Sequence, residues 1–197
     1  MLDLANNDFG NVRRGYKFIE EFGRVAHSDQ VAAAVALGYR STLCASLGDD
    51  FGLGRRDATR PPEVHISREQ LEALVRAARV AGLGTIVMPR DRSSLDHCAA
   101  LDVDTWKIAS DDITHVALTE AIAATQRWVI VAADRAPLDD IEALLARFQA
   151  RGFTYAFKHA VSVHPDPAGG SLVPQRKPRL VIVFRPPGAA ASLRPPS

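Results

Sequence analysis

The sequence lacks the features that would tie it to a membrane or to an oxidising compartment. Its two cysteines, Cys44 and Cys98, lie far apart and form no CxxC pair, which excludes a disulfide framework and a zinc knuckle. No segment approaches the roughly 18 apolar residues of a membrane-spanning helix. The opening Met-Leu-Asp-Leu has neither the basic region nor the apolar run of a signal peptide. We therefore expect a cytoplasmic protein with reduced thiols and no membrane partner.

An excess of charge of one sign is also missing. The 24 basic residues nearly balance the 23 acidic ones, so the formal net charge is +1. This balance predicts no nucleic-acid partner. The hydrophobic content of 47% is ordinary for a globular protein, and 197 residues suffice for one domain with a substantial core.

What the chain does contain is a regular alternation of short apolar segments and helical patterns. Ser67 and Gln70 form a capping box at the start of one predicted helix, and Gly82 ends it. Apolar residues recur three or four positions apart in three of the predicted helices and predict their buried faces: Tyr16, Ile19, Phe22 and Val25 in the first, Leu71, Leu74, Val75 and Ala78 in the second, and Ile141, Leu144, Leu145 and Phe148 in the last. Such alternation indicates βα units and a parallel sheet. The predicted strands are 2–4, 31–37, 85–88, 106–108, 128–131 and 155–159; the predicted helices are 12–26, 67–81, 93–101, 116–124 and 138–151.

The last part of the chain has a different character. Residues 166–197 contain repeated prolines, clustered arginines and a Gly-Ala-Ala-Ala run, and only 180–184 resembles a strand. We expect a βα domain over 1–165 and a mostly irregular tail over 166–197.

The most informative motif is Trp106-Lys107-Ile108-Ala109-Ser110-Asp111-Asp112-Ile113-Thr114. It places Lys107 at the carboxyl end of a predicted strand and Ser110 in the turn that follows. In an α/β barrel, catalytic groups sit where strands end and βα loops begin. A lysine there can meet a phosphate or carboxylate, and a serine hydroxyl can add a hydrogen bond. The alternative is a solvated lysine at a strand end.

Four segments in order resemble the sialic acid synthase family. They are Lys107-Ile108-Ala109-Ser110 with the Asp-Ile-Thr after it, Met88-Pro89-Arg90-Asp91, Leu4-Ala5-Asn6-Asn7-Asp8, and His159 followed by Pro165. The resemblance covers about residues 2–165. It implies a (β/α)8 barrel, of which this chain has about six βα units and therefore a partial barrel.

The resemblance also implies a reaction. The family condenses phosphoenolpyruvate (PEP) with an N-acetylated amino sugar, of the N-acetylmannosamine type, to form a nonulosonic (sialic) acid. Carbon 3 of PEP attacks the open-chain aldehyde, water adds to carbon 2, and phosphate leaves. A divalent metal, manganese or magnesium, orients the aldehyde in the family.

Five residues of this chain match functional positions of the family. Lys107 and Ser110 match residues that hold PEP, and Asn6 lies in the family's substrate-binding Asn-His turn. Asp3 stands where the family has a glutamate near the reacting centre. His159 matches the first metal-binding histidine; its alternative is a structural histidine at a strand end.

Other positions depart from the family pattern. Ala36-Leu37-Gly38 replaces Lys-Phe-Gln, so a PEP-binding lysine is missing, and Arg40 is two residues beyond. Met88 and Ala132-Ala133-Asp134 replace hydroxyl-bearing residues, and Asp8 replaces a histidine. No segment matches the second metal histidine, since His164 occupies a tyrosine position. One lost charge-assisted hydrogen bond costs about 1.5–3 kcal/mol, so these losses weaken a catalytic site considerably.

Three functions therefore stay open: an active synthase, an inactive relative or PEP- or phosphosugar-binding module, and an unrelated βα sensor. An incomplete barrel has two open edges. We expect that a partner copy or the tail covers them, or that the protein is marginally stable. A truncated or frame-shifted family member would explain the missing βα units.

Overall fold

The computed structural model describes residues 2–4, 12–39, 66–133, 136–165 and 172–189, with the strand residues 2–4, 158–165 and 172–180 described through their backbone. The chain divides into two compact units. The first comprises residues 1–107 with 190–197, and the second residues 108–189. No helix in these described ranges is long and apolar enough to cross a membrane.

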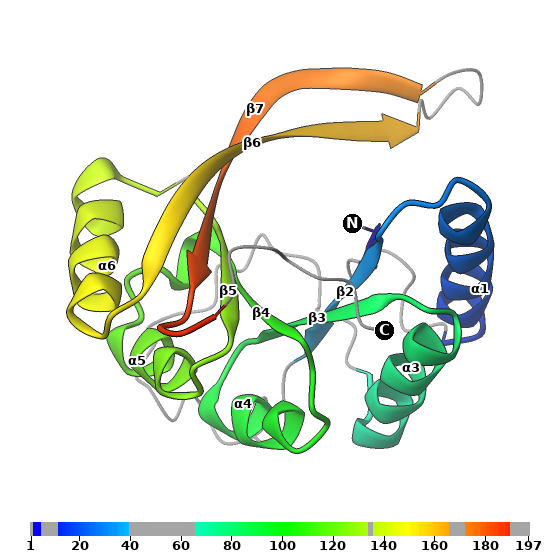
Figure 1. Ribbon diagram of the computed structural model, residues 1–197, viewed down its shortest axis with the longest axis horizontal. Helices are drawn as coiled ribbons and strands as arrows, with labels where there is room; N and C mark the ends of the chain where they lie inside the picture. Colours follow the sequence, from blue (N-terminus) through cyan, green and yellow to red (C-terminus); the bar gives the residue numbers. More distant parts are fainter. Residues whose placement is uncertain (1, 5–11, 40–65, 134–135, 166–171, 190–197) are drawn as a thin grey trace, which may run out of the picture. The chain divides into compact units, whose positions relative to one another are not determined.

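The first unit is built on parallel strands joined by helices, as the alternation predicted (Figure 1). The strands follow the order β1-β2-β3-β4, and each is parallel to the next. The elements are β1 (Leu2–Leu4), α1 (Val12–Ser28), β2 (Ala34–Tyr39), α3 (Arg68–Val80), β3 (Gly84–Pro89), α4 (Arg92–Ala99) and β4 (Thr105–Ile108).

Helix α3 forms where the sequence signals are strongest. Ser67 accepts a hydrogen bond from the backbone of Gln70, and the Gln70 side chain accepts one from the backbone of Ser67, which completes the predicted capping box. Gly82, at φ +71°, lets the chain turn away. The buried side chains are the four predicted ones, Leu71, Leu74, Val75 and Ala78.

Helix α1 packs differently from its prediction. The recurrence of Tyr16, Ile19, Phe22 and Val25 predicted an apolar face, but Tyr16 and Val25 are exposed. Gly15, Ile19 and Gly23 are buried instead, and the two glycines face Leu74 and Ala81. Because glycine has no side chain, α1 approaches α3 closely along this stripe.

Strand β4 is fastened to β3 by a side chain. The Asp104 carboxylate accepts hydrogen bonds from the Thr85 backbone N–H (2.7 Å) and hydroxyl (2.6 Å), and the Asp104 N–H donates back to the hydroxyl (3.1 Å). Pairing then runs from Ile86 with Thr105 to Val87 with Trp106. This link sets the register of β4 and hence the height of Lys107.

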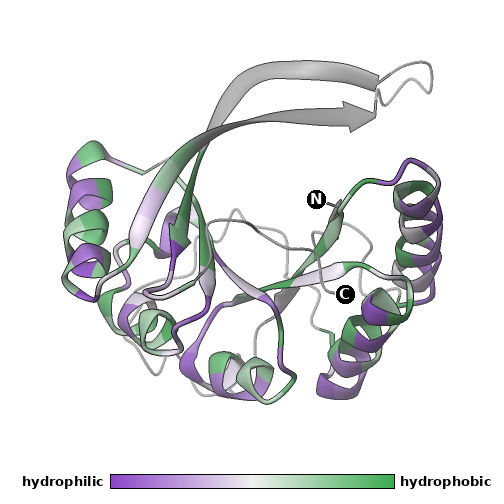
Figure 2. Ribbon diagram, viewed as in Figure 1, coloured by the Kyte–Doolittle hydropathy of each residue, from purple (hydrophilic) through white to green (hydrophobic). Residues whose placement is uncertain are grey.

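The second unit continues with helices and strands and ends in a hairpin. Its elements are the 3₁₀ turn η2 (Ser110–Asp112), α5 (Val116–Ala124), β5 (Trp128–Ala132), α6 (Leu138–Ala150), β6 (Thr154–Pro165) and β7 (Leu172–Arg185). Hydrophobic and hydrophilic residues alternate along α6, as they do along α1 and α3 (Figure 2). The buried residues of α6 are Ile141, Leu144 and Phe148. These three belong to the predicted apolar face.

The hairpin corrects two expectations. Strand β7 runs over 14 residues, whereas we predicted a strand only over 180–184 and an otherwise irregular tail. It also lies between β5 and β6, antiparallel to both, so the predicted strand 155–159 does not pair directly with β5. Phe184 and Ile182 are fully buried, and the packing of the Phe184 ring on Phe148 helps to hold β7 in place.

Candidate functional site

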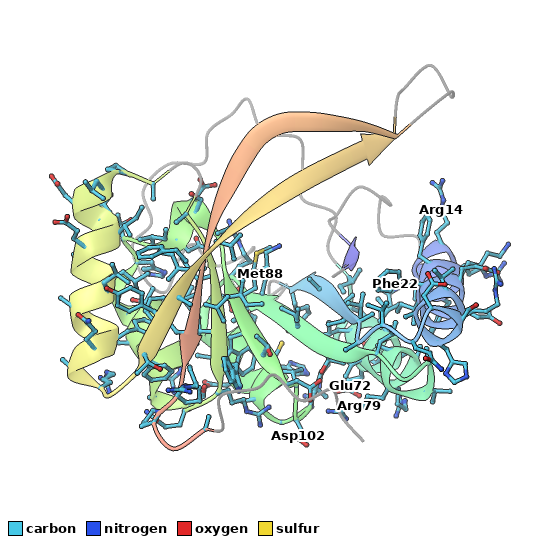
Figure 3. All side chains as sticks on the ribbon, turned by 45° about the horizontal axis from the view of Figure 1, so that its top comes forward. Arg14, Phe22, Glu72, Arg79, Met88 and Asp102 are labelled. Carbon is cyan, nitrogen blue, oxygen red and sulfur yellow. The ribbon has the colours of Figure 1, made fainter. Side chains whose placement is uncertain are left out.

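The strand register of the first unit places Lys107 beside two other strand ends. Val87 pairs with Trp106, and Gly38 pairs with Met88. Met88 and Lys107, the next residues of their strands, therefore lie at the same height, and Figure 3 labels Met88 at this end of β3. Trp106 and Val87 are fully buried, whereas Met88 and Lys107 are partly exposed. Since side chains alternate across a strand, Lys107 and Met88 share the less covered face.

The chain after β4 continues in a tight turn with buried polar residues. Ser110, Asp112 and His115 are only 8%, 3% and 7% exposed. The Asp112 N–H donates to the Ala109 carbonyl, and the His115 N–H donates to the Asp112 carbonyl. Buried polar side chains of these types are uncommon in a domain core. Two residues of chain separate Lys107 from Ser110, so a half-buried cation is followed closely by a buried hydroxyl.

The loop after β3 is held rigidly. Asp91 caps α4 by accepting a hydrogen bond from the Ser94 N–H (2.6 Å), and the Ser94 hydroxyl accepts from the N–H groups of Arg90 and Asp91. The Arg90 N–H also lies 3.1 Å from the Tyr39 carbonyl. We predicted that α4 begins at Ser93; the missed signal was the capping pair Asp91 and Ser94, three residues apart.

Buried titratable groups gather behind these strand ends. Burial raises the pKa of the Cys98 thiol to about 12, with a smaller contribution from the Asp91 carboxylate. Burial also raises the pKa of Tyr39, whose ring meets the edge of the His97 imidazole at 5.6 Å. His97 Nε2 in turn lies 3.6 Å from a Glu72 carboxylate oxygen. These groups join β2, α3 and α4 and form a support for the strand ends.

For the other predicted site residues, the structure describes either the backbone alone or nothing. The backbone of Asp3 pairs with Ala36 in the row of Ile86 and Thr105, two residues before the height of Lys107. Asn6, Asp8 and Arg40 lie outside the described residues, as do Asp134 and Cys44. The structure therefore leaves the roles of Asp3 and Asn6 as predictions.

His159 does not lie where the sequence placed it. We expected it at the carboxyl end of a barrel strand, but β6 continues to Pro165, and the backbone of His159 pairs with Leu180 of β7. The antiparallel ladder with β7 explains the extension, because it satisfies the backbone groups of 159–165. His159 thus occupies the middle of a strand, and its metal-binding role stays a prediction.

The described residues do not fit a metal centre. Across the described ranges, no three His, Cys, Asp or Glu residues are grouped so that they could hold a metal ion. Metal sites in enzymes normally use about three protein ligands.

The replaced family positions are apolar in the structure as well. Ala36 is 2% exposed in the middle of β2, and Ala133 is 3% exposed just after β5. Neither can supply a charge or a hydroxyl. Among the described residues of the strands β1, β2, β3 and β4, Lys107 is the one lysine.

Comparison with known proteins gives a consistent result. The NeuB family model matches residues 57–170, and no curated protein matches. Spore coat polysaccharide biosynthesis protein E from Chromobacterium violaceum ATCC 12472 is 27% identical, with a TM-score of 0.66 over 77% of this chain and 45% of that one.

Two further structures share the fold. The N-acetylneuraminic acid (sialic acid) synthetase from Leptospira borgpetersenii serovar Hardjo-bovis, solved with citrate, is 19% identical, with a TM-score of 0.62 over 76% of this chain and 49% of that one. Spore coat polysaccharide biosynthesis protein spsE from Bacillus subtilis is 17% identical, with a TM-score of 0.59 over 77% and 40%.

This chain thus spans less than half the length of each of these proteins. The predicted fold class, an α/β fold of the partial (β/α) barrel type, is confirmed. The family model covers more than half of the chain, including β3, β4 and the turn with Ser110. The chain belongs to the NeuB family.

Proposed function

We propose that this chain binds PEP at the carboxyl end of β4 and acts in nonulosonic acid synthesis, with an N-acetylated amino sugar as the second substrate. The observation that carries the proposal is the arrangement around β4. Lys107 is partly exposed on the less covered face, and the buried Ser110 follows in the next turn, within a segment matched by the NeuB family model.

Charge supports the role of Lys107. PEP carries a carboxylate and a phosphate, and a lysine ammonium is a compact cation that can meet either group. The lysine stem can lie along the apolar strand while its amine reaches the ligand. The Ser110 hydroxyl adds a donor, and a hydrogen bond to a charged group contributes about 1.5–3 kcal/mol.

The proposed chemistry is an aldol-like condensation. The C3 carbon of PEP forms a bond with the aldehyde carbon of the open-chain sugar, whose oxygen takes up a proton. Water adds to C2, and the C2–O bond to phosphate breaks, so inorganic phosphate leaves. In this proposal Lys107 neutralises the anion as charge moves toward phosphate, and Asp3 is the carboxylate near the reacting carbon, with Asn6 binding the substrate.

A second candidate function is binding of PEP or a phosphosugar without turnover. It is favoured by the buried Ala36, which stands where the family resemblance places a second PEP-binding lysine. One missing ion-paired group costs about a factor of ten or more in rate or binding, since 1.4 kcal/mol is tenfold. Ala133 supports the same reading, because it replaces a hydroxyl.

The experiment that tests the proposal is phosphate release from PEP with N-acetylmannosamine, with and without Mn²⁺. We expect release that falls at least tenfold in Lys107→Ala and stays unchanged in Lys17→Ala, a lysine exposed on α1. Release that is equal in wild type and Lys107→Ala would refute the site. PEP binding that depends on Lys107 but gives no phosphate would support the second function instead.

A further inference from the structure

The hairpin of β6 and β7 continues past its contact with the rest of the second unit (Figure 1). Strand β5 pairs with β7 from Val181 to Phe184, whereas β6 and β7 pair with each other from Thr154 to Pro165. We call residues 158–165 and 172–180 the distal ribbon. Over Leu172–Leu180, the described residues pair β7 with β6 alone.

The hairpin differs from the rest of the chain in the sign of its charge. Strands β6 and β7 contain five basic residues and no acidic one: Lys158, Arg176, Lys177, Arg179 and Arg185. The rest of the chain then has 19 basic and 23 acidic residues, a net charge of −4. The overall charge of +1, which predicted no nucleic-acid partner, averages over two regions of opposite sign.

Two of these basic residues, Arg176 and Lys177, lie at an irregular point of the ladder. Ala160 pairs with Arg179 and Ser162 pairs with Gln175, so Val161 alone faces the three residues 176–178. Arg176 and Lys177 therefore lie within a bulge of the ladder. Bulges bend a strand and interrupt its pairing, and they are frequent beside functional sites.

Strand β7 is poorly suited to pairing with an additional β-strand. Pro174 and Pro178 have no N–H group to donate to a neighbouring strand. Prolines and basic residues along an edge are the usual protection against edge-to-edge association. A partner of the distal ribbon would therefore interact with its positive charges and not with its backbone.

We propose that the distal ribbon binds the sugar-phosphate backbone of duplex nucleic acid. A two-stranded antiparallel ribbon fits a DNA major groove, which is about 12 Å wide. Residues Leu172–Leu180 span about 30 Å at roughly 3.4 Å per residue, the length of about nine base pairs. Arg176, Lys177 and Arg179 lie within that length, and Lys158 of β6 lies just beyond it, paired with Val181, so the ribbon offers four positive charges to backbone phosphates. The binding depends on charge and carries no sequence preference.

The test is fluorescence anisotropy of the full chain with a labelled 20-base-pair DNA duplex of mixed sequence, from 50 to 200 mM salt. We expect binding whose log affinity falls with log salt at a slope of about −3.6, as for four released counterions. Arg176→Glu with Lys177→Glu should weaken binding at least tenfold at 50 mM salt.

The matched control is Arg13→Glu with Arg14→Glu, two exposed arginines of α1 that give the same change in net charge. We expect its affinity to stay within about twofold of wild type, with circular dichroism confirming that both variants are folded. The proposal is overturned if wild type shows no salt-dependent binding, or if the control loses as much affinity. Binding to phosphatidylserine vesicles without binding to the duplex would also overturn it.

Discussion

At the scale of single residues, two glycines of α1 allow a close approach to Leu74 of α3 and to Ala81, which follows α3. A Cβ atom at Gly23 would lie 2.7 Å from the Ala81 Cβ and 2.9 Å from the Ala81 carbonyl oxygen, whereas one at Gly15 would meet the end of the Leu74 side chain at 3.1 Å. The Ala81 backbone cannot shift as the flexible end of the Leu74 side chain can. Gly23 should therefore tolerate an added Cβ less well than Gly15.

Gly23→Ala should therefore destabilise the protein, while Gly15→Ala should not. Alanine gains about 1 kcal/mol of helix propensity at either position, but overpacking costs about 1–3 kcal/mol. Urea unfolding should give a lower free energy of unfolding for Gly23→Ala and an equal or higher one for Gly15→Ala. Equal gains in both variants would mean that α1 and α3 do not meet along this stripe.

Cys98 provides a second prediction at the same scale, because its pKa is raised to about 12 by burial and by Asp91. A thiol with a normal pKa of about 8.5 is partly ionised at pH 8 and reacts readily. In a Cys44→Ser variant, Cys98 should react slowly with a disulfide reagent in buffer and rapidly in urea. Rapid reaction in buffer would show that Cys98 is not buried.

The raised pKa of Cys98 also makes the free energy of unfolding depend on pH. Above about pH 9 the unfolded thiol loses its proton while the folded thiol keeps it, so the folded state binds more protons. The free energy of unfolding should then fall with pH by at most about 1.4 kcal/mol per unit. Cys98→Ala should show a shallower decline between pH 9 and 10, measured by urea titrations, than wild type; an identical decline would contradict the assignment.

At the scale of elements, the hairpin is anchored through aromatic rings at its base. Phe184 is fully buried, with its ring centroid 4.4 Å from that of Phe148 and 5.9 Å from that of Tyr155. Phe153 also packs on Phe148. These contacts fasten β7 between β5 and β6, although the rest of β7 is rich in prolines and charges.

Phe184→Ala should accordingly lower the free energy of unfolding by about 3–5 kcal/mol, as for a large side chain removed from a core. Phe157→Ala provides the control on β6, since Phe157 is 53% exposed and exposed substitutions usually change stability by less than about 0.5 kcal/mol. Similar values for the two variants in urea titrations would contradict the position of β7.

Local sequence patterns predicted those helices and strands whose structure depends mainly on their own residues. The buried face of α3 follows from apolar residues three and four apart, and both ends carry their capping residues. The face of α1 could not be predicted, because glycines that mediate a close approach carry no hydrophobic signal. Most of β7 was missed for a related reason: its pairing is with distant residues, and strand formation depends strongly on such context.

The candidate site was predictable to a similar extent. Lys107 at the end of β4 and Ser110 in the following turn could be recognised from a motif of contiguous residues. The height of Lys107 relative to Met88 could not, because it depends on the hydrogen bonds between Asp104 and Thr85. The position of His159 was wrong because the strand that contains it is extended by β7.

At the scale of the whole molecule, the chain belongs to the NeuB family but spans less than half the length of each of the three similar structures. The fold and the β4 motif are retained, while Ala36 and Ala133 stand where charge or hydroxyl groups were expected. The central question is therefore whether the proposed PEP site around Lys107 binds PEP in this chain. That can be measured without turnover.

The most direct measurement is the thermal melt of the full chain with and without PEP. A ligand at a hundredfold excess over its Kd stabilises the folded state by about 2.7 kcal/mol. We expect an upward shift in Tm for wild type and for Lys17→Ala, and none for Lys107→Ala. An unshifted wild type, or an equal shift in Lys107→Ala, would contradict this expectation.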